Sequence, residues 1–291
     1  MNVTVEAPAK INLTLDVVGR RDDGYHLVET VMQAVDLCDR VTVRRTDKPG
    51  AVSLLCDDAR VPDGPDNTAV RAAAAFFAAC GLPNPGVEIG LRKRIPLQAG
   101  LAGGSADAAG TLVALDRLMD TRMTAAELCA VAETVGADVP FCVLGAAAYA
   151  EGIGTILTPL PSLPDCAVVI AKPLDGVSTA EAYRLVDRAA LTRRPHTGAA
   201  VDAVCAGDLA AVAHGLCNVF EEALALPEVA AIGQVMREHG TLGCRMTGSG
   251  SAVFGLFDNE EAARRCAAAL RRAPVFEWDN HILPTQKREI G

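Results

Sequence analysis

Apolar and polar residues alternate over the first 17 positions of the chain. Apolar side chains occupy the odd positions from Val3 to Val17, and polar side chains occupy most of the even positions between them. A period of two is typical of a β-strand with one buried face. Pro8 interrupts the pattern, and proline lacks the amide that a strand interior needs, so we expect two short strands that meet there.

The same reasoning along the rest of the chain predicts a mixture of strands and helices. Strands are expected at about 27–35, 40–45, 87–95, 146–150, 153–157, 166–171, 242–246, 252–257 and 275–282. Helices are expected at about 67–80, 101–119, 124–136, 179–187, 197–226, 228–238 and 259–272. The elements do not alternate as regular βαβ units, which favours an α+β fold over a doubly wound α/β fold.

Some polar residues mark helix starts and a domain boundary. Thr124 with Glu127, and Ser178 with Glu181, have the spacing of a capping box. The proline-rich run 158–164 is the best candidate for a boundary, because proline ends regular structure. We therefore expect an N-terminal lobe at 1–160 and a C-terminal lobe at 161–291.

Charge and cysteine content narrow the classes of partner. The formal net charge of −9 argues against nucleic acid or an anionic membrane as partner. The ten cysteines form no C-x-x-C pair and are expected to be buried thiols in a reducing compartment. The sequence shows no signal-peptide pattern after Met1 and no apolar run long enough to span a bilayer. We expect a soluble cytoplasmic protein that binds a small molecule, as a monomer or homodimer.

A glycine-rich segment, residues 96–109, joins a predicted strand to a predicted long helix. Glycines let the backbone approach a ligand, and the free amides of a first helical turn bind anions, so the segment predicts a phosphate site. It is neither a P-loop, because Ser105 rather than lysine follows Gly104, nor a G-x-G-x-x-G motif. The alternative is a plain flexible connection, although a connection needs fewer glycines.

Three polar residues elsewhere are candidates for chemistry. Lys10 and Asn12 are on the polar face of the first strand, and lysine is scarce in this chain. Asp138 follows a predicted helix end, and Pro140 is expected to keep Val139 extended, so that the carboxylate projects outward. Each could be an ordinary solvated residue. Together, a lysine and an aspartate beside a phosphate loop could orient and deprotonate a substrate hydroxyl.

Three sequence blocks together resemble the GHMP kinase superfamily, named for galactokinase, homoserine kinase, mevalonate kinase and phosphomevalonate kinase. The blocks are residues 8–13, 96–109 and 244–254, and they extend over nearly the whole chain. The resemblance implies the family's two-lobed fold, with an N-terminal ribosomal-protein-S5-like lobe that binds nucleotide and substrate (1–160) and a C-terminal ferredoxin-like GHMP kinase lobe (161–291). It also implies transfer of a phosphoryl group from ATP, with Mg²⁺ expected, to an alcohol.

Residues 19–27 and 136–141 resemble the branch of this superfamily that acts in the non-mevalonate isoprenoid pathway. That similarity implies phosphorylation of a 2-hydroxyl on a cytidine-diphosphate substrate. Lys10 and Asp138 match the family's catalytic pair, and Asn12, Tyr25 and His26 match its substrate side, where Tyr25 and His26 would contact cytosine. The positions that match its ATP site are Asn67 and Lys93, near the adenine, and Pro96, Gly100, Leu101, Ala102, Gly103, Gly104 and Ser105 in the loop.

The chain departs from the family pattern in the loop. Ala102 and Ala106 stand where many relatives carry glycine and serine. We expect Ala102 to keep a negative φ and Ala106 to make no ligand contact, and no acidic residue maps to a magnesium ligand. The alternatives are a family kinase for another small alcohol (homoserine, mevalonate or a sugar) and a non-catalytic ATP sensor.

Overall fold

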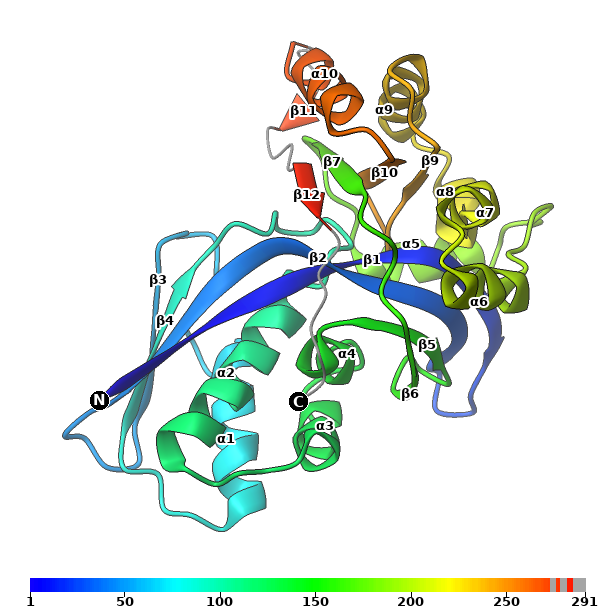
Figure 1. Ribbon diagram of the computed structural model, residues 1–291. Helices are drawn as coiled ribbons and strands as arrows, with labels where there is room; N and C mark the ends of the chain where they lie inside the picture. The colour runs from blue at the N-terminus through cyan, green and yellow to red at the C-terminus, as the bar shows by residue number, and fades with distance from the viewer. Residues whose placement is uncertain (273–275, 278–281, 285–291) are drawn as a thin grey trace. The chain divides into compact units, whose positions relative to one another are not determined.

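The computed structural model of the protein describes residues 1–272, 276–277 and 282–284. The chain divides into two compact units (Figure 1). Unit 1 contains residues 1–9, 37–95 and 102–145, and unit 2 contains residues 10–36, 96–101 and the chain from 146 onward. This division differs from the expected lobes, and the boundary near residue 160 stays a prediction.

Unit 1 is built on four strands. The N-terminal part of β1 and the C-terminal part of β2 continue into β4 and then β3, with β2 antiparallel to β4 and β3 parallel to it. The bounds of these strands are β1 (Asn2–Arg20), β2 (His26–Arg45), β3 (Val52–Cys56) and β4 (Val87–Arg92).

The first two strands are longer than the sequence predicted. β1 is continuous through Pro8, and β2 covers both stretches that were predicted as separate strands, 27–35 and 40–45. The prediction of two short strands at Pro8 was wrong because β8, the neighbour of β1 opposite β2, pairs only with Thr14 and Leu15. At Pro8 the strand therefore lies at the sheet edge, where a missing amide donor is tolerated.

Helices on one side of these strands complete unit 1 (Figure 1). They are α1 (Thr68–Cys80), α2 (Gly103–Met119), α3 (Ala125–Glu133) and α4 (Val139–Leu144). The predicted capping box is present, because the Thr124 hydroxyl accepts from the Glu127 amide while the Glu127 carboxylate accepts from the Thr124 amide. That box satisfies two amides that the first helical turn leaves free.

The segment after Asp138 is helical, so the expected extended conformation of Val139 was wrong. Asp138 has φ −83° and ψ −11° and is the N-cap of α4, with Pro140 in the first helical turn. Proline is favourable there because its fixed φ suits a helix and its missing amide would be unpaired anyway. This benefit outweighs the preference of a residue before proline for extended backbone.

Unit 2 includes the other halves of the two long strands. The N-terminal part of β2 pairs with β5 (Ala147–Glu151), which pairs with β6 (Ile156–Leu160), and β1 pairs in parallel with β8 (Cys217–Asn218) at Thr14 and Leu15. The predicted pair of strands at 146–150 and 153–157 is thus present, although the second strand begins and ends three residues later than predicted.

A second sheet in unit 2 has the strand order β11-β7-β10-β9, with β12 also paired to β7. Two helices, α9 and α10, pack on β7, β9 and β10, and Ile232, Met236 and Phe257 belong to the buried core beneath them. The bounds are β7 (Ala167–Pro173), β9 (Gly243–Met246), β10 (Val253–Phe257), β11 (Phe276–Glu277), β12 (Ile282–Pro284), α9 (Pro227–Glu238) and α10 (Glu260–Leu270). The last predicted strand, 275–282, falls partly outside the described residues.

The predicted single helix at 197–226 is three helices with a short strand between two of them. Gly207 has φ +65° and ends the first helix, and the Asp208 carboxylate then caps the second. Glycine favours a helix end and aspartate a helix start, which explains this break, and Asn218 caps the third helix after the short strand. The elements of this region are α6 (Thr197–Ala206), α7 (Leu209–Gly215), β8 and α8 (Val219–Leu224), and α5 (Thr179–Val186) precedes them, capped by Ser178.

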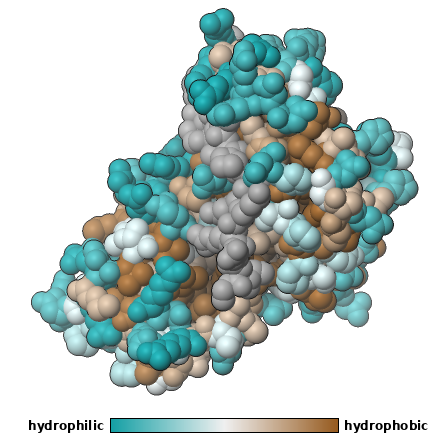
Figure 2. Space-filling view, in the orientation of Figure 1, coloured by the Kyte–Doolittle hydropathy of each residue, from teal (hydrophilic) through white to brown (hydrophobic). Residues whose placement is uncertain are grey.

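The surface, the cysteines and the helix lengths in the described part of the protein show no special chemistry. Hydrophilic side chains cover the region of α10 in Figure 2, where Arg264 and Arg265 pair with glutamates one turn earlier. All ten cysteines are free, and only Cys205 is exposed. Among the described residues, no helix has the length and apolar character needed to cross a bilayer.

Gly110 of α2 provides a test of the packing in unit 1. A Cβ at this position would lie 2.8 Å from Cγ2 of Val41 on β2 and 3.2 Å from Cβ of Ala7 on β1. Replacing a helical glycine by alanine usually stabilises a helix by about 1 kcal/mol, but here the overlap dominates. We expect Gly110→Ala to lower the free energy of unfolding by about 1–3 kcal/mol, measured by urea denaturation.

Gly198→Ala is the matched control. Gly198 is in α6, and a Cβ there meets nothing within 4 Å. This variant should be neutral or more stable than the parent. Equal midpoints for the two variants would contradict the packing of α2 against β1 and β2.

Candidate active site

A buried polar network in unit 2 surrounds Lys10 and Asn12 of β1. The Lys10 ammonium donates to Oδ1 of Asn12 at 2.6 Å and to the Gly100 carbonyl at 3.0 Å, and the two residues are 4% and 2% exposed. The Asn12 amide nitrogen donates to the Thr30 hydroxyl at 2.8 Å. A buried charge requires such partners, because burial without them costs several kcal/mol. The side chains are therefore held rigidly.

The third glycine-containing block joins this network. The backbone amide of Gly248 donates to Oδ1 of Asn12 at 2.9 Å, and the backbone amide of Asn12 donates to the Thr247 hydroxyl at 3.0 Å. Asn218 supports the turn from the other side, since its side chain donates to the carbonyls of Met246 and Gly248. Thus residues 10–12 and 247–248, which lie in the first and third sequence blocks, are in direct contact.

The second block contacts both of the others at Gly100. This residue has φ +72°, and a Cβ on it would overlap the carbonyl oxygen of Thr247. Gly248 has the reciprocal constraint, because its Cβ would lie 2.6 Å from the Gly100 carbonyl oxygen. The amide of Lys10 also donates to the Leu101 carbonyl at 3.2 Å. Glycine at these two positions is required by the close approach of two backbones.

The remainder of the glycine-rich loop belongs to unit 1 and leads into α2. Ala102 has φ +59°, so the expectation of a negative φ at this residue was wrong. A left-handed alanine costs about 1–2 kcal/mol, which the surrounding structure must offset. Gly103, Gly104 and Ser105 then form the first turn of α2, the type of helix start that binds phosphate groups.

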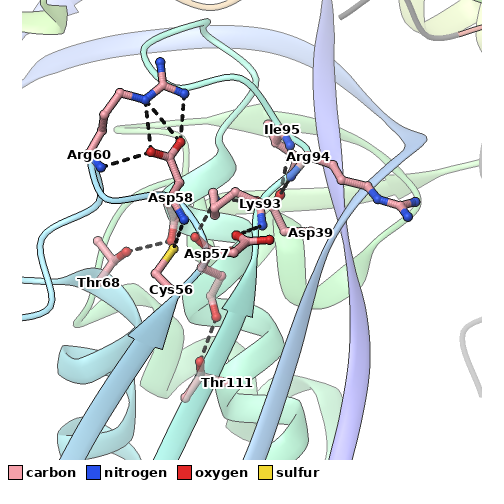
Figure 3. Close-up of polar contacts among 12 residues, drawn as sticks. Asp39, Cys56, Asp57, Asp58, Arg60, Thr68, Lys93, Arg94, Ile95 and Thr111 are labelled. Carbon is pink, nitrogen blue, oxygen red and sulfur yellow. Dashed lines mark hydrogen bonds and ion pairs between the residues drawn. The ribbon is translucent and has the colours of Figure 1, made fainter.

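The two residues matched to the adenine site use their side chains within unit 1. Asn67 caps α1, because its Oδ1 accepts from the Ala69 amide at 2.8 Å, and its Nδ2 donates to the Pro62 carbonyl at 2.7 Å. Lys93 donates to Oδ2 of Asp107 at 2.6 Å and also to Oδ2 of Asp39. Asp107 and Asp39 lie 14 and 54 residues from Lys93 in the sequence, and Figure 3 labels Lys93 and Asp39.

The cluster of Asp39, Lys93 and Asp107 is almost completely buried, with side chains 0%, 6% and 4% exposed. Burial opposes the charged form of Lys93, but the carboxylates of Asp107 and Asp39 more than offset this and raise its pKa. Burial also raises the pKa of Asp107 to about 7, with Lys93 opposing and Asp39 adding to the shift. Burial therefore raises the pKa of Asp107, whereas the two carboxylates raise the pKa of Lys93 against burial, and we conclude that Lys93 is charged.

Asp138 is half-buried at the start of α4 in unit 1, and its side chain makes no capping hydrogen bond. Lys10 belongs to unit 2. The expected pairing of these two residues at a substrate hydroxyl stays a prediction.

The candidate cytosine contacts differ in exposure. Tyr25 is 62% exposed, whereas the His26 ring stacks on Tyr183 of α5 with centroids 4.4 Å apart. Nε2 of His26 lies 2.8 Å from Oδ1 of Asp187, which also pairs with Arg20 at 3.7 Å. An exposed aromatic ring beside an anchored imidazole offers a stacking face and a hydrogen-bonding edge.

Two family models match this chain: the GHMP kinases N terminal domain at residues 67–146 and the GHMP kinases C terminal domain at residues 200–275. The 4-diphosphocytidyl-2-C-methyl-D-erythritol kinase of Alkaliphilus metalliredigens is 42% identical, over 98% of this chain and 97% of its own. The chain belongs to the GHMP kinase family. The enzyme with the same name from Pelotomaculum thermopropionicum is 44% identical, over 98% of both chains.

Solved structures agree with this assignment to the GHMP kinases. A crystal structure of 4-(cytidine 5'-diphospho)-2C-methyl-D-erythritol kinase matches with TM-score 0.77 and 38% identity, over 98% of this chain and all of that chain. A homoserine kinase from Cytophaga hutchinsonii matches with TM-score 0.78 at 22% identity, which supports the fold alone. The predictions of a two-lobed α+β GHMP kinase fold and of an ATP-dependent kinase are confirmed.

Sequence reasoning missed several residues of this GHMP kinase site. Thr247 and Gly248 lie within the third sequence block, residues 244–254, so that block could have identified them. Thr30, Tyr183 and Asp187 lie outside the quoted blocks, and their contacts join segments that are distant in sequence. No pattern in the residues around Asp39 or Asp107 predicts that both carboxylates bind the same lysine.

The crossing at Gly100 predicts a strong effect of a single methyl group. We expect Gly100→Ala to lower the free energy of unfolding by at least about 2 kcal/mol, because alanine costs energy at this φ and its Cβ overlaps Thr247. Thermal unfolding followed by circular dichroism measures this change.

Gly104→Ala in the same loop is the control for stability. Its Cβ would lie 3.4 Å from the Thr68 hydroxyl, an ordinary contact, and its φ is not left-handed. A Gly100→Ala protein that unfolds at the same temperature as the Gly104→Ala protein would refute the close approach of the Gly100 and Thr247 backbones.

Proposed function

We propose that this GHMP kinase transfers the γ-phosphoryl group of ATP to the 2-hydroxyl of 4-diphosphocytidyl-2-C-methyl-D-erythritol, in the non-mevalonate isoprenoid pathway. The observation that carries the proposal is the 42–44% identity, over nearly the full length of both chains, to kinases named for that substrate. The exposed Tyr25 beside the anchored His26 supports it, because a cytosine ring needs a stacking surface next to hydrogen-bonding groups.

In this proposal Lys10 and Asp138 act on the acceptor hydroxyl. Asp138 orients the hydroxyl and accepts its proton as the oxygen attacks phosphorus, and its carboxylate is not used as a helix cap. The Lys10 ammonium stabilises the negative charge that develops on the attacking oxygen. The buried hydrogen bonds of Lys10 to Asn12 and Gly100 fix its position in advance, so little reorganisation is required during transfer.

Asn12 contributes mainly by orientation. Its side-chain oxygen accepts hydrogen bonds from Lys10 and Gly248, and one N–H of its amide donates to Thr30. The second N–H remains for the substrate, since an asparagine amide has two donors. Tyr25 and His26 hold the cytosine, and the stacking of His26 on Tyr183 fixes the plane of the imidazole.

The nucleotide site comprises the glycine-rich loop and the start of α2. The amides of Gly103, Gly104 and Ser105 bind the ATP phosphates, helped by the helix dipole. Pro96, Gly100, Leu101 and Ala102 shape the loop. Asn67 retains one unused amide hydrogen and one lone pair for adenine.

Mg²⁺ is expected to enter with ATP. Within residues 1–272 and the two short described strands beyond them, no group of three His, Cys, Asp or Glu side chains could hold a metal ion. In kinases Mg²⁺ keeps several waters and is bound mainly by phosphates with one or two carboxylates. The Ser105 hydroxyl, at the helix start proposed to bind the phosphates, would be available to the ion, which would neutralise phosphate charge.

An acceptor panel tests the proposal. Purified protein is incubated with ATP, Mg²⁺ and each of the cytidyl substrate, homoserine, mevalonate and a sugar, and ADP release is measured. Turnover of the cytidyl substrate alone supports the proposal. Faster turnover of another alcohol would favour a different family kinase, and ATP binding without ADP release on any acceptor would favour a sensor.

Asp138→Asn tests the proton acceptor. We expect kcat to fall at least about 100-fold, because an amide cannot take up the hydroxyl proton, with the KM for both substrates largely unchanged. Steady-state kinetics measures this. Asp120→Asn, at an exposed residue paired with Arg122 after α2, is the control and should retain full activity. Normal turnover in the Asp138 variant would remove that residue from the mechanism.

A further inference from the structure

The carboxylate of Asp39, the ammonium of Lys93 and the carboxylate of Asp107 form one buried cluster, which we call the loop clamp. Figure 3 labels two of its members, Asp39 and Lys93. Its members come from β2, from the segment after β4 and from α2. The part of the glycine-rich segment that precedes α2, residues 96–102, lies in the sequence between Lys93 and Asp107. Each loop end is therefore attached to the same ammonium.

The start of the loop is held through Asp39. Oδ1 of Asp39 accepts hydrogen bonds from the backbone amides of Arg94 at 2.5 Å and Ile95 at 2.8 Å, while its Oδ2 accepts from Lys93. One carboxylate thus fixes three consecutive residues. The amide of Lys93 is bound as well, because it donates to Oδ1 of Asp57 at 2.8 Å.

The end of the loop is held through Asp107 and the first residue of α2. Oδ2 of Asp107 accepts from Lys93 at 2.6 Å. A Cβ on Gly103 would lie 3.1 Å from Cγ2 of Ile95 and 3.6 Å from Nζ of Lys93, so the helix start packs directly against the loop start. The carbonyl of Gly104 accepts from the Thr68 hydroxyl at 2.7 Å, which ties the same turn to α1.

The chemistry of the clamp indicates a task beyond packing. Two carboxylates share one ammonium, and Oδ1 of Asp107 is buried without a hydrogen-bond partner among the described residues. Buried ion clusters rarely add net stability, because desolvation cancels most of the attraction. The loop that they close contains Gln98 and Ala102 in the left-handed region, a costly conformation that persists only where the surroundings enforce it.

We propose that Asp39, Lys93 and Asp107 are positioning residues that hold the glycine-rich loop in its phosphate-binding conformation, and that Lys93 acts through these carboxylates and not on the adenine base. The inference rests on the proposed use of this loop for ATP. It changes the role of Lys93 suggested by family resemblance, since its ammonium is committed to two buried carboxylates.

The two roles of Lys93 predict different nucleotide preferences. A residue that contacts adenine affects ATP more than GTP, because the two bases differ at the contacted edge. A residue that positions the loop affects both triphosphates equally, because they share the phosphates. Asp107→Asn should also reproduce the effect of Lys93→Met if the two residues act as one unit.

The test measures the dissociation constants of ATP and GTP by titration calorimetry, and the KM for the acceptor in an ADP-release assay. We expect Lys93→Met and Asp107→Asn each to weaken both nucleotides by at least about tenfold, because small displacements of positioning groups have effects of this size or larger. The ATP-to-GTP ratio and the acceptor KM should stay within about twofold of the parent values. Lys48→Met, at an exposed lysine of unit 1, should change none of these.

Three results would overturn the inference: unchanged nucleotide binding in both clamp variants, a loss confined to ATP, or a loss in Lys93→Met that Asp107→Asn does not share. If Lys93→Met fails to fold, Asp39→Asn replaces it, since this change keeps the shape of the side chain. Parent protein that binds no ATP would instead refute the proposed function, and the two failures are thereby distinguished.

Discussion

The burial of a charged lysine next to an asparagine imposes the strictest constraint on this protein. Lys10 and Asn12 are almost inaccessible to water, so their polar atoms must find partners inside the protein. The partners come from Gly100 and from Gly248, 90 and 236 residues away from the atoms that they bind. Satisfying one ammonium and one amide therefore brings the three motif blocks of the GHMP kinases together, and glycine is required where their backbones cross.

Features determined by neighbouring residues could be predicted from the sequence. The Thr124–Glu127 capping box, the Asn67–Cys80 helix and the strand-to-helix glycine loop depend on contacts within a few residues, and each is present. The continuity of β1 through Pro8 depends instead on which strand lies beside it, and the short span of β8 decides that. The left-handed backbone of Ala102 is also imposed from outside, against the residue's own preference.

The scarcity of lysine was an informative signal, although it indicated burial and not a role. Lys10, Lys93 and Lys172 are all buried, whereas Lys48 is exposed, and Lys287 lies outside the described residues. Lys172 binds the carbonyls of Pro173 and Leu174, so its charge stabilises a strand end. Lys93 forms the loop clamp. What each ammonium does is determined by its acceptors: those of Lys172 are its neighbours in the chain, whereas Lys10 and Lys93 also bind acceptors 90 and 54 residues away.

The interleaved units have a consequence for how the chain is made. Both long strands contribute to each unit, and β1 obtains its parallel neighbour only when Cys217 and Asn218 have been synthesised. Contacts of such long sequence separation slow folding, since the loop-closure entropy must be spent before they form. In a nascent chain β1 can therefore pair with β2 early, but its opposite edge stays unpaired at Thr14 and Leu15 until most of the polypeptide has been synthesised. An unpaired strand edge during that interval is a site at which aggregation can begin.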